Sequence, residues 1–332
     1  MARYEVPAGP REEDVPKGEI LAGKYRVECV LGAGGMGVVV RVTNLEGSQV
    51  FALKFLRPSV ARKPSAAARF LREAQAGRRI KSPHVVSIPD VGELSPGSPY
   101  LVMEYLEGTS LDKRLAGEEF LPLDQACDLA LQVSEGLAAA HAMGVIHRDI
   151  KPANLFLSTD PDGTELLKIV DFGISKILDP DSAAGPQLTR TQTSIGSPLY
   201  MSPEQMRSAR TADFRADQWS LGVVLYRMAT GHLPFDAKSL PRLCVQVLEA
   251  DFVPLANRRP DLPAEFAVAV ERCLRCLPAD RYADIAELAA ALVPFAPPEG
   301  RGRAKRCREI LRAAEPQVTT PPPSAEPTIP TP

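Results

Sequence analysis

The first third of the chain carries the short apolar and β-branched runs that favour β-strands. Such runs lie at residues 25–27, 38–42, 50–54 and 100–103. Residues 66–80 differ, because this stretch is rich in Ala and Arg, contains no Pro and suits a helix. The pattern therefore predicts a small β-rich unit with one main helix.

Beyond Gly108 the apolar residues recur at helical spacing instead. The segments with this period are 124–143, 217–229, 240–248, 265–277 and 285–292. The chain shows no internal repeat. A small β-rich unit followed by a larger helical unit predicts an α+β fold with two lobes.

Composition separates both ends of the chain from this body, which spans residues 20–293. Residues 1–19 are polar and contain three prolines, so we expect a flexible leader. Residues 294–332 begin with a basic stretch, 301–312, and end in a segment rich in Pro and Thr. We expect this tail to be extended or disordered. Its basic stretch suits a solvated short helix or, alternatively, a segment that docks on a partner or lies near a membrane.

Composition and charge narrow the function classes. The chain has 332 residues, of which 45% are hydrophobic and 24% charged, as in ordinary globular proteins. Its 39 basic and 41 acidic residues give a net charge of −2, which argues against a nucleic-acid binder with a basic face. No apolar run reaches the roughly 18–20 residues that span a bilayer, and the N-terminus lacks the apolar core of a signal peptide. We expect a cytoplasmic protein without a transmembrane segment in this chain.

A glycine-rich stretch is the first candidate for chemistry. The sequence Gly32-Ala33-Gly34-Gly35-Met36-Gly37 fits G-x-G-x-x-G, which by itself is a weak signal. A dinucleotide-binding fold would open a helix directly after it, whereas residues 38–42 favour a strand. The glycines are therefore expected to cap a hairpin and to place backbone N–H groups over phosphates.

Lys54 closes the apolar strand at 50–54. A lysine in such a strand is costly to bury unless it meets an acidic partner and an anion. Glu73, on the predicted helix 66–80, is a candidate partner. Taken alone, each of the two residues is also compatible with an ordinary surface charge.

Further motifs follow in order: HRDIKPAN at 147–154, DFG at 171–173 and SPE at 202–204. With the glycine-rich stretch and the lysine strand, this ordered set resembles the protein kinases, in particular the bacterial group similar to eukaryotic Ser/Thr kinases. The resemblance covers about residues 20–293 and implies a bilobal fold, with an N-lobe over about 20–104 and a C-lobe over about 108–293. It implies an enzyme that transfers the γ-phosphate of ATP to Ser or Thr hydroxyls of protein substrates.

The resemblance assigns roles to four residues around the transferred group. Asp149 orients the acceptor hydroxyl and takes its proton, and Lys151 neutralises the phosphoryl group. Asn154 is the third catalytic residue, and together with Asp171 it binds Mg²⁺ or Mn²⁺. Mg²⁺ suits such a pair of oxygen donors, because it takes few carboxylates together with phosphate oxygens.

The resemblance also implies a nucleotide site. The glycine-rich loop covers the phosphates, and Lys54 holds the α- and β-phosphates while paired with Glu73. Apolar side chains enclose the adenine, and backbone groups of residues 104 and 106 bind its polar edge. The implied ATP-binding residues are Leu31, Gly32, Ala33, Gly34, Gly35, Met36, Gly37, Val39, Ala52, Lys54, Glu73, Met103, Glu104, Leu106 and Phe156.

Three further residues look structural by the same resemblance. Glu204 and Arg281 are expected to form a buried ion pair, and Asp217 is expected to brace the catalytic loop. One position departs from the family pattern: Gly77 stands four residues after Glu73, where an apolar residue usually packs behind the helix.

The loop between Asp171 and Glu204 is a candidate switch. By resemblance, Thr191 and Thr193 are the expected autophosphorylation sites. Arg148 is the natural receptor, because its guanidinium can bind a phosphate with two hydrogen bonds. Phosphorylation of one copy by another would require a second copy of this chain as a partner, in a homodimer.

Two other functions stay open: a pseudokinase scaffold, which has the same fold, and a small-molecule phosphotransferase, which shares the nucleotide lobe. A pseudokinase scaffold would lack part of the site, whereas the residues it would lose, Lys54, Glu73, Asp149, Asn154 and Asp171, are all present. A small-molecule phosphotransferase would usually lack the SPE segment and the long loop before it. Both alternatives are separable from a protein kinase by an ATP transfer assay.

Overall fold

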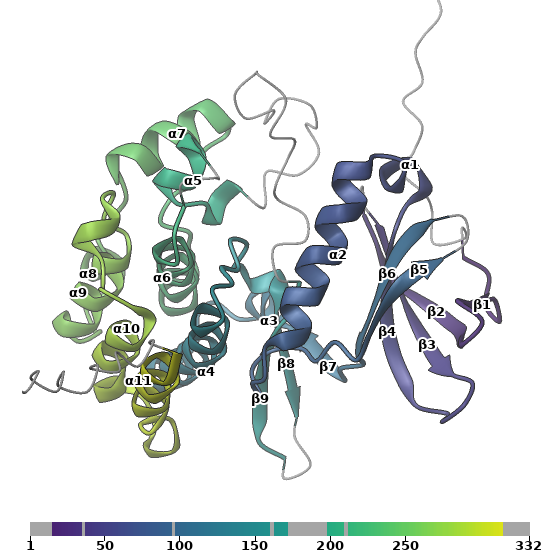
Figure 1. The fold of residues 1–332 in the computed structure, drawn as a ribbon. Coiled ribbons are helices and arrows are strands. Elements are labelled where there is room, and N and C mark those ends of the chain that lie inside the picture. Colours follow the sequence, from purple (N-terminus) through teal and green to yellow (C-terminus); the bar gives the residue numbers. More distant parts are fainter. Residues whose placement is uncertain are drawn as a thin grey trace, which may run out of the picture.

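The structure, a computed structural model, describes residues 15–34, 37–94, 97–159, 163–171, 198–208 and 212–314. These residues form two lobes that lie side by side, one built on a β-sheet and one mainly helical (Figure 1). The α+β, bilobal architecture expected from the sequence is confirmed.

The N-lobe is a six-stranded sheet in which every hydrogen-bonded pair of strands is antiparallel. The predicted strands 25–27, 38–42, 50–54 and 100–103 lie within β2, β3, β4 and β6. The sheet order is β1-β2-β3-β4-β6-β5, with β1 at Ile20–Leu21, β2 at Tyr25–Ala33, β3 at Gly37–Asn44, β4 at Val50–Leu56, β5 at Asp90–Leu94 and β6 at Ser98–Glu104.

Alternating side chains of these strands serve two separate cores, as the two-residue period of a strand requires. Val40, Leu53 and Val102 belong to a cluster on one face of the sheet. Ala52 and Met103 belong to a cluster on the other face, which helix α2 covers with Phe70 and Ala74.

Helix α2, Pro64–Arg79, is the one long helix of the N-lobe and follows the short α1, Pro58–Ala61. It runs along the sheet in Figure 1. Gly77 explains how closely it packs, because a Cβ built there would lie 3.0 Å from Cδ1 of Ile88. The glycine that departs from the family pattern therefore stands where the helix packs closely against Ile88.

The C-lobe is centred on two helices, α4 at Leu123–Ala142 and α6 at Arg215–Thr230, most of whose residues are buried. Trp219 of α6 is fully buried and stacks on Phe235, with ring centroids 5.4 Å apart. The surrounding helices are α3 at Leu111–Gly117, α5 at Pro203–Arg207, α7 at Leu240–Glu249, α8 at Leu255–Arg258, α9 at Ala264–Cys273, α10 at Ile285–Leu292 and α11 at Arg303–Ala314.

A second, three-stranded sheet lies where the lobes meet, and sequence periodicity did not reveal it. Its order is β7-β8-β9, with β7 at Gly108–Ser110, β8 at Leu155–Thr159 and β9 at Glu165–Ile169. Strands of three to five residues are too short to give a clear period. The loop 143–154 leads into β8, and residues 170–171 leave β9, so this sheet holds both segments in place.

The basic stretch at 301–312 is helical, as expected, but the helix packs on the C-lobe instead of being fully solvated. It forms most of α11, which packs against α4 and α10. Ala304 and Cys307 are buried, because these small side chains allow the helix axis to approach α4 closely. Asp128 and Glu135 of α4 pair with two of its arginines. Residues 315–332 lie outside the described part of the chain.

No helix within the described ranges is both long enough and apolar enough to cross a lipid bilayer.

Candidate functional site

The loop at 147–154 is hydrogen-bonded to Asp217 of α6, which is fully buried. Its two carboxylate oxygens accept hydrogen bonds from the backbone N–H groups of His147, at 2.9 Å, and Arg148, at 2.7 Å. His141 Nε2 lies 2.8 Å from the same carboxylate. Burial alone would raise the pKa of Asp217, but these hydrogen bonds outweigh it and the pKa is lowered. The expected bracing role of Asp217 agrees with this geometry.

Arg148 adopts a backbone conformation that this bracing stabilises. Its φ is +64°, a region that non-glycine residues seldom occupy. Its N–H donates to Asp217, and its carbonyl accepts from Gln205 Nε2 at 3.0 Å. Gln205, at the start of α5, is a residue that sequence reasoning missed. The strained turn directs the next residue, Asp149, into the site.

His147 connects the two loops that form the site. Its ring is fully buried, and burial lowers the pKa, so the imidazole is neutral. Nδ1 accepts from the N–H of Asp149 at 3.2 Å, so the proton resides on Nε2, which donates to the carbonyl of Val170 at 3.2 Å. The ring therefore joins residue 149 to the segment just before Asp171.

Asp149, Lys151 and Asn154 form one hydrogen-bonded cluster. Lys151 Nζ donates to Asp149 Oδ2 at 2.8 Å, and Asn154 Nδ2 donates to the same oxygen at 3.1 Å and to the Asp149 carbonyl at 2.9 Å. Asp149 and Asn154 are buried. The three residues that the resemblance implied to be catalytic are thus brought together.

Asp171 stands beside this cluster, since the N–H of Val170 donates to the carbonyl of Asn154 at 2.9 Å. Its carboxylate accepts from Lys54 Nζ, 2.7 Å away on β4. Like Arg148, Asp171 has a positive φ, +58°. The two candidate metal ligands, Asn154 and Asp171, therefore lie on adjacent segments.

Glu73 is not paired with Lys54 in the structure, in contrast to the expected arrangement. Lys54 bonds to Asp171 instead, and Glu73 Oε2 is buried without a hydrogen-bond partner among the described residues. Burial raises the pKa of Glu73 to about 7, although positive charges at Arg69, Arg148 and Lys54 oppose this shift. The carboxyl is thus close to the lysine without contacting it.

The apolar positions that are expected to bind ATP line the sheet beside Lys54. Ala52 and Met103 pair in register across β4 and β6, and both are buried. Val39 and Leu106 pack on the same cluster. Leu31 is 45% exposed, as suits a side chain at the rim of a binding site.

The glycine-rich stretch forms the predicted hairpin. Gly32 and Ala33 end β2, Gly37 begins β3, and the N–H of Gly34 donates to the carbonyl of Gly37 at 2.9 Å. A Cβ at Gly37 would overlap the carbonyl of Phe55, so only glycine permits the close approach of β3 and β4 there. Gly35 and Met36 lie outside the described residues.

The segment that connects the lobes is fixed by Glu104. Its Oε1 accepts from Lys168 Nζ at 2.8 Å and from the N–H of Ser87 at 2.7 Å. Phe156 lies opposite Lys168 in the register of β8 and β9. Lys168 and Ser87 were not singled out from the sequence, because the contacts join segments far apart in the chain.

The expected pair of Glu204 and Arg281 is confirmed. Two parallel hydrogen bonds of 2.7 and 2.8 Å join the guanidinium to the carboxylate, and Arg281 is 1% exposed. The proposed phosphorylation sites Thr191 and Thr193 lie outside the described residues.

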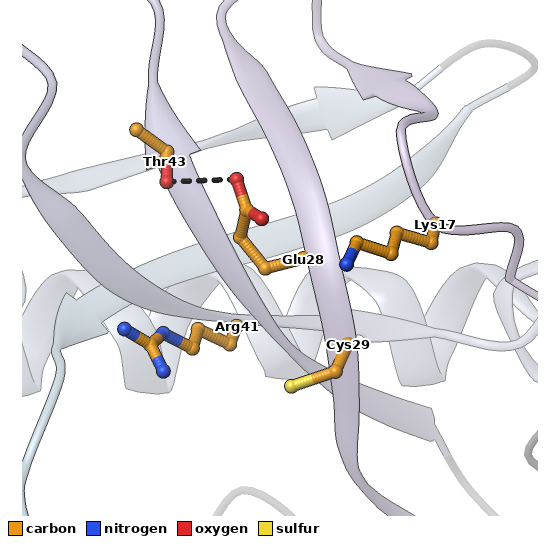
Figure 2. A pocket seen from close by; sticks show the side chains of 5 residues that line it. All are labelled: Lys17, Glu28, Cys29, Arg41 and Thr43. Carbon is orange, nitrogen blue, oxygen red and sulfur yellow. Dashed lines mark hydrogen bonds between the residues drawn. The ribbon is translucent and has the colours of Figure 1, made fainter.

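A surface cavity lies on strands β2 and β3 of the N-lobe sheet (Figure 2), and its lining residue Arg41 pairs in register with Ala52. It measures about 480 Å³ and is lined by Lys17, Glu28, Cys29, Arg41 and Thr43. Glu28 accepts a 3.0 Å hydrogen bond from Thr43, which lowers the pKa of the glutamate. No residue expected in the catalytic or nucleotide site lines this cavity.

Comparison with known proteins places this geometry in context. Residues 25–291 match the family described as the protein kinase domain. Pkn3 of Myxococcus xanthus, a serine/threonine-protein kinase, is 39% identical over 83% of this chain and 50% of its own length. PknB of Mycobacterium tuberculosis, also a serine/threonine-protein kinase, is 35% identical over 82% of this chain and 43% of its own length. The chain thus spans half or less of each of these relatives.

A solved structure has a similar fold. The crystal structure of the PknI kinase domain of Mycobacterium tuberculosis has a TM-score of 0.65 and 29% sequence identity. The match covers 85% of this chain and 100% of that one.

Proposed function

Because this chain belongs to the protein kinase family, we propose that it transfers the γ-phosphate of ATP to Ser or Thr hydroxyls of protein substrates. The observation that carries the proposal is the single cluster of Asp149, Lys151 and Asn154 beside Asp171 and Lys54. This set holds a proton acceptor, two cations and hard oxygen ligands within adjoining segments. Phosphoryl transfer requires these groups, because positioning and charge neutralisation dominate its catalysis.

The nucleotide would lie between the sheet of the N-lobe and the β7-β8-β9 sheet. Ala52, Val39 and Met103 offer the apolar surface that an adenine ring requires. Lys54 is the cation that would hold the α- and β-phosphates. For this it must leave Asp171, so binding of the triphosphate replaces the ion pair of 2.7 Å with two separate contacts.

The donor set fits Mg²⁺ or Mn²⁺. Asn154 supplies an amide oxygen and Asp171 a carboxylate, and these hard ligands suit a cation that retains phosphate oxygens. When bound, the metal supplies positive charge that neutralises the phosphate oxygens. Side chains of this chain would accept the proton and balance the charge of the transferred group.

Asp149 would receive the proton of the acceptor hydroxyl as the hydroxyl oxygen attacks the γ-phosphorus. The bond between the γ-phosphorus and the oxygen that bridges it to the β-phosphate would break, and ADP would leave with that oxygen. Lys151, bonded to Asp149 Oδ2, would turn to the transferred phosphoryl group and balance its charge. The lysine two positions after the catalytic aspartate resembles the Ser/Thr-specific pattern.

Autophosphorylation at Thr191 or Thr193 would regulate this site. Arg148 supports this part of the proposal, because its Nε is buried and has no hydrogen-bond partner among the described residues. A phosphothreonine carries about −1.5 to −2 charges and would supply such a partner. Mass spectrometry after incubation with Mg·ATP tests it, and an active enzyme without phosphate on either threonine rules it out. Transfer between two copies would make a homodimer the reacting species.

The function itself is tested with radiolabelled ATP and a generic protein acceptor, followed by acid hydrolysis and separation of the phosphoamino acids. The proposal expects label on phosphoserine and phosphothreonine. Absence of transfer with retained ATP binding would indicate a pseudokinase scaffold. Label found only in a small molecule would indicate the alternative phosphotransferase.

A further inference from the structure

Helix α11 lies beyond the matched residues 25–291, yet it is part of the folded C-lobe. Its inner side buries Ala304 and Cys307, while Ile310 and Leu311 pack on the core at its edge. Lys305 points away from the body and is 82% exposed. The helix therefore has a docked face and a solvent face.

Arg303, at the start of α11, reaches across the docked face to a loop of the other lobe. Its Nη1 donates to Nε2 of His84 at 2.9 Å, and its Nε lies 3.4 Å from Asp128 Oδ1. The same guanidinium lies 3.6 Å from Glu135 Oε2. His84 and Glu135 are 2% and 6% exposed. This is a buried contact between the C-terminal helix and the loop at 80–89 that joins α2 to β5.

The hydrogen bonds define the state of His84. An arginine only donates, so Nε2 of His84 must accept and its proton resides on Nδ1. Nδ1 then donates to the carbonyl of Leu167 at 3.0 Å. Burial lowers the pKa of His84, which agrees with this neutral form. The ring is thus fixed between α11 and β9.

The backbone around His84 is tied to the end of β9. Its carbonyl accepts from the N–H of Ile169 at 2.9 Å, and the carbonyl of Ile169 accepts from Val86 at 3.0 Å. Gly136 of α4 packs against the same place, since a Cβ there would lie 2.9 Å from the His84 carbonyl. Asp171 follows Ile169 by two residues. The loop therefore connects α2, which carries Glu73, with the segment that carries Asp171.

We propose that Arg303 is a positioning residue: through His84 it fixes the α2–β5 loop and thereby the placement of Glu73 relative to Asp171. Helix α11 is then a clamp on the catalytic site from outside the matched domain. The effect on turnover rests on the proposed kinase function, whereas the effect on the loop does not.

Hydrogen–deuterium exchange of the full chain, followed by mass spectrometry of peptides from residues 80–89, tests the clamp. Arg303→Ala should speed exchange there by about two- to thirtyfold, the range expected when a coupling contact is lost. Arg306→Ala is the matched control, because Arg306 also pairs with Glu135, at 3.0 Å, and lies on the same helix. Arg306 reaches His84 only through Glu135, whose Oε2 lies 3.8 Å from His84 Nε2, so Arg306→Ala should speed exchange at 80–89 less than Arg303→Ala does. If Arg303→Ala does not fold, Arg303→Gln keeps part of the packed stem and carries the same comparison.

Turnover gives the second readout. Arg303→Ala should lower kcat for protein phosphorylation by about the same factor, with a smaller change in KM for ATP, and Arg306→Ala should change kcat less. Unchanged exchange at 80–89 in Arg303→Ala, or equal acceleration by both variants, would overturn the clamp. If the wild type transfers no phosphate, the proposed function fails, and the exchange comparison still decides whether Arg303 fixes the loop.

Discussion

Lys54 Nζ lies 2.7 Å from Asp171 Oδ1, so a lysine of β4 and the carboxylate that follows β9 form a direct ion pair across 117 residues of sequence. Their side chains are 16% and 36% exposed, so the pair remains open to solvent. In the proposed mechanism, one partner holds phosphates and the other holds a metal. The pair thus brings the two lobes together at the place where the triphosphate would bind.

Replacing Lys54 with Met should give a folded protein that does not transfer phosphate. Methionine keeps the length of the stem but removes the charge that positions the phosphates. Positioning contributes several kcal/mol to such reactions, so kcat should fall below about a tenth of the wild-type value. Lys24→Met is the control, because Lys24 is 57% exposed on the same lobe. Retention of more than a tenth of the activity would show that Lys54 does not have this role.

Glu73 makes stability depend on pH. Its pKa in the folded protein is raised to about 7 from 4.5, chiefly by burial. The folded protein favours the protonated carboxyl. This contribution to the free energy of unfolding is fully present below the pKa of the unfolded chain and is lost as the pH rises through about 7. Glu73→Gln, which does not titrate, should therefore have a melting temperature near that of wild type at pH 4.5 and a higher one at pH 8.

Glu28→Gln is a control of opposite sign for this pH dependence. The pKa of Glu28 is lowered by the hydrogen bond from Thr43, so its contribution is present above the unfolded pKa and lost as pH falls. This variant should gain nothing at pH 8. A Glu73→Gln difference that is the same at both pH values would contradict the assignment of a buried, unpaired carboxyl.

Asp217→Asn should weaken both the fold and catalysis. The substitution keeps the shape but replaces one carboxylate oxygen with an NH2 group, which cannot accept a hydrogen bond. One of the two backbone N–H groups, of His147 or of Arg148, would then lose its acceptor. One buried N–H left without a partner costs about 1–3 kcal/mol, which denaturant unfolding would measure. The positive φ of Arg148 would lose its support, so kcat should also fall. The control Asp261→Asn should unfold at the same denaturant concentration as wild type, because this side chain is exposed. Wild-type stability in Asp217→Asn would disprove the bracing role.

Activity should require a divalent cation. EDTA should abolish transfer, and added Mg²⁺ or Mn²⁺ should restore it, because Asn154 and Asp171 cannot neutralise phosphate charge by themselves. The measurement is the initial rate of label transfer with and without chelator. Unchanged transfer in EDTA would exclude the metal-dependent mechanism.

Local patterns predicted most of the fold and singled out the residues that the structure brings together around Asp149. The strand around Val40 shows the period of two that one buried face imposes, whereas the helices around Leu131 and Val224 are apolar and buried on almost all sides. The loop at 147–154 was found because its residues stand close together in sequence. Its hydrogen bonds to Asp217 followed from the resemblance, which carries long-range information that periodicity lacks.

Long-range packing explains what the sequence did not predict. Whether Lys54 meets Glu73 or Asp171 depends on where α2 lies relative to the sheet, which no local pattern encodes. The docking of α11 was missed for a similar reason, since its basic residues suggest a solvated helix until Asp128 and Glu135 are placed opposite them. The strand at Gly108–Ser110 was too short to show a period.

The most direct measurement is the rate of ATP-dependent phosphorylation of a protein acceptor by wild type and by Asp149→Asn, with Asp112→Asn as the matched control. Asp149 is buried beside Lys151 and Asn154. Asp112, in contrast, is exposed and pairs with Arg227, which is not one of the expected site residues. The account predicts transfer by wild type and Asp112→Asn, and a loss of at least about a hundredfold in folded Asp149→Asn, the usual contribution of a general base. Transfer by Asp149→Asn within a few fold of wild type would contradict it.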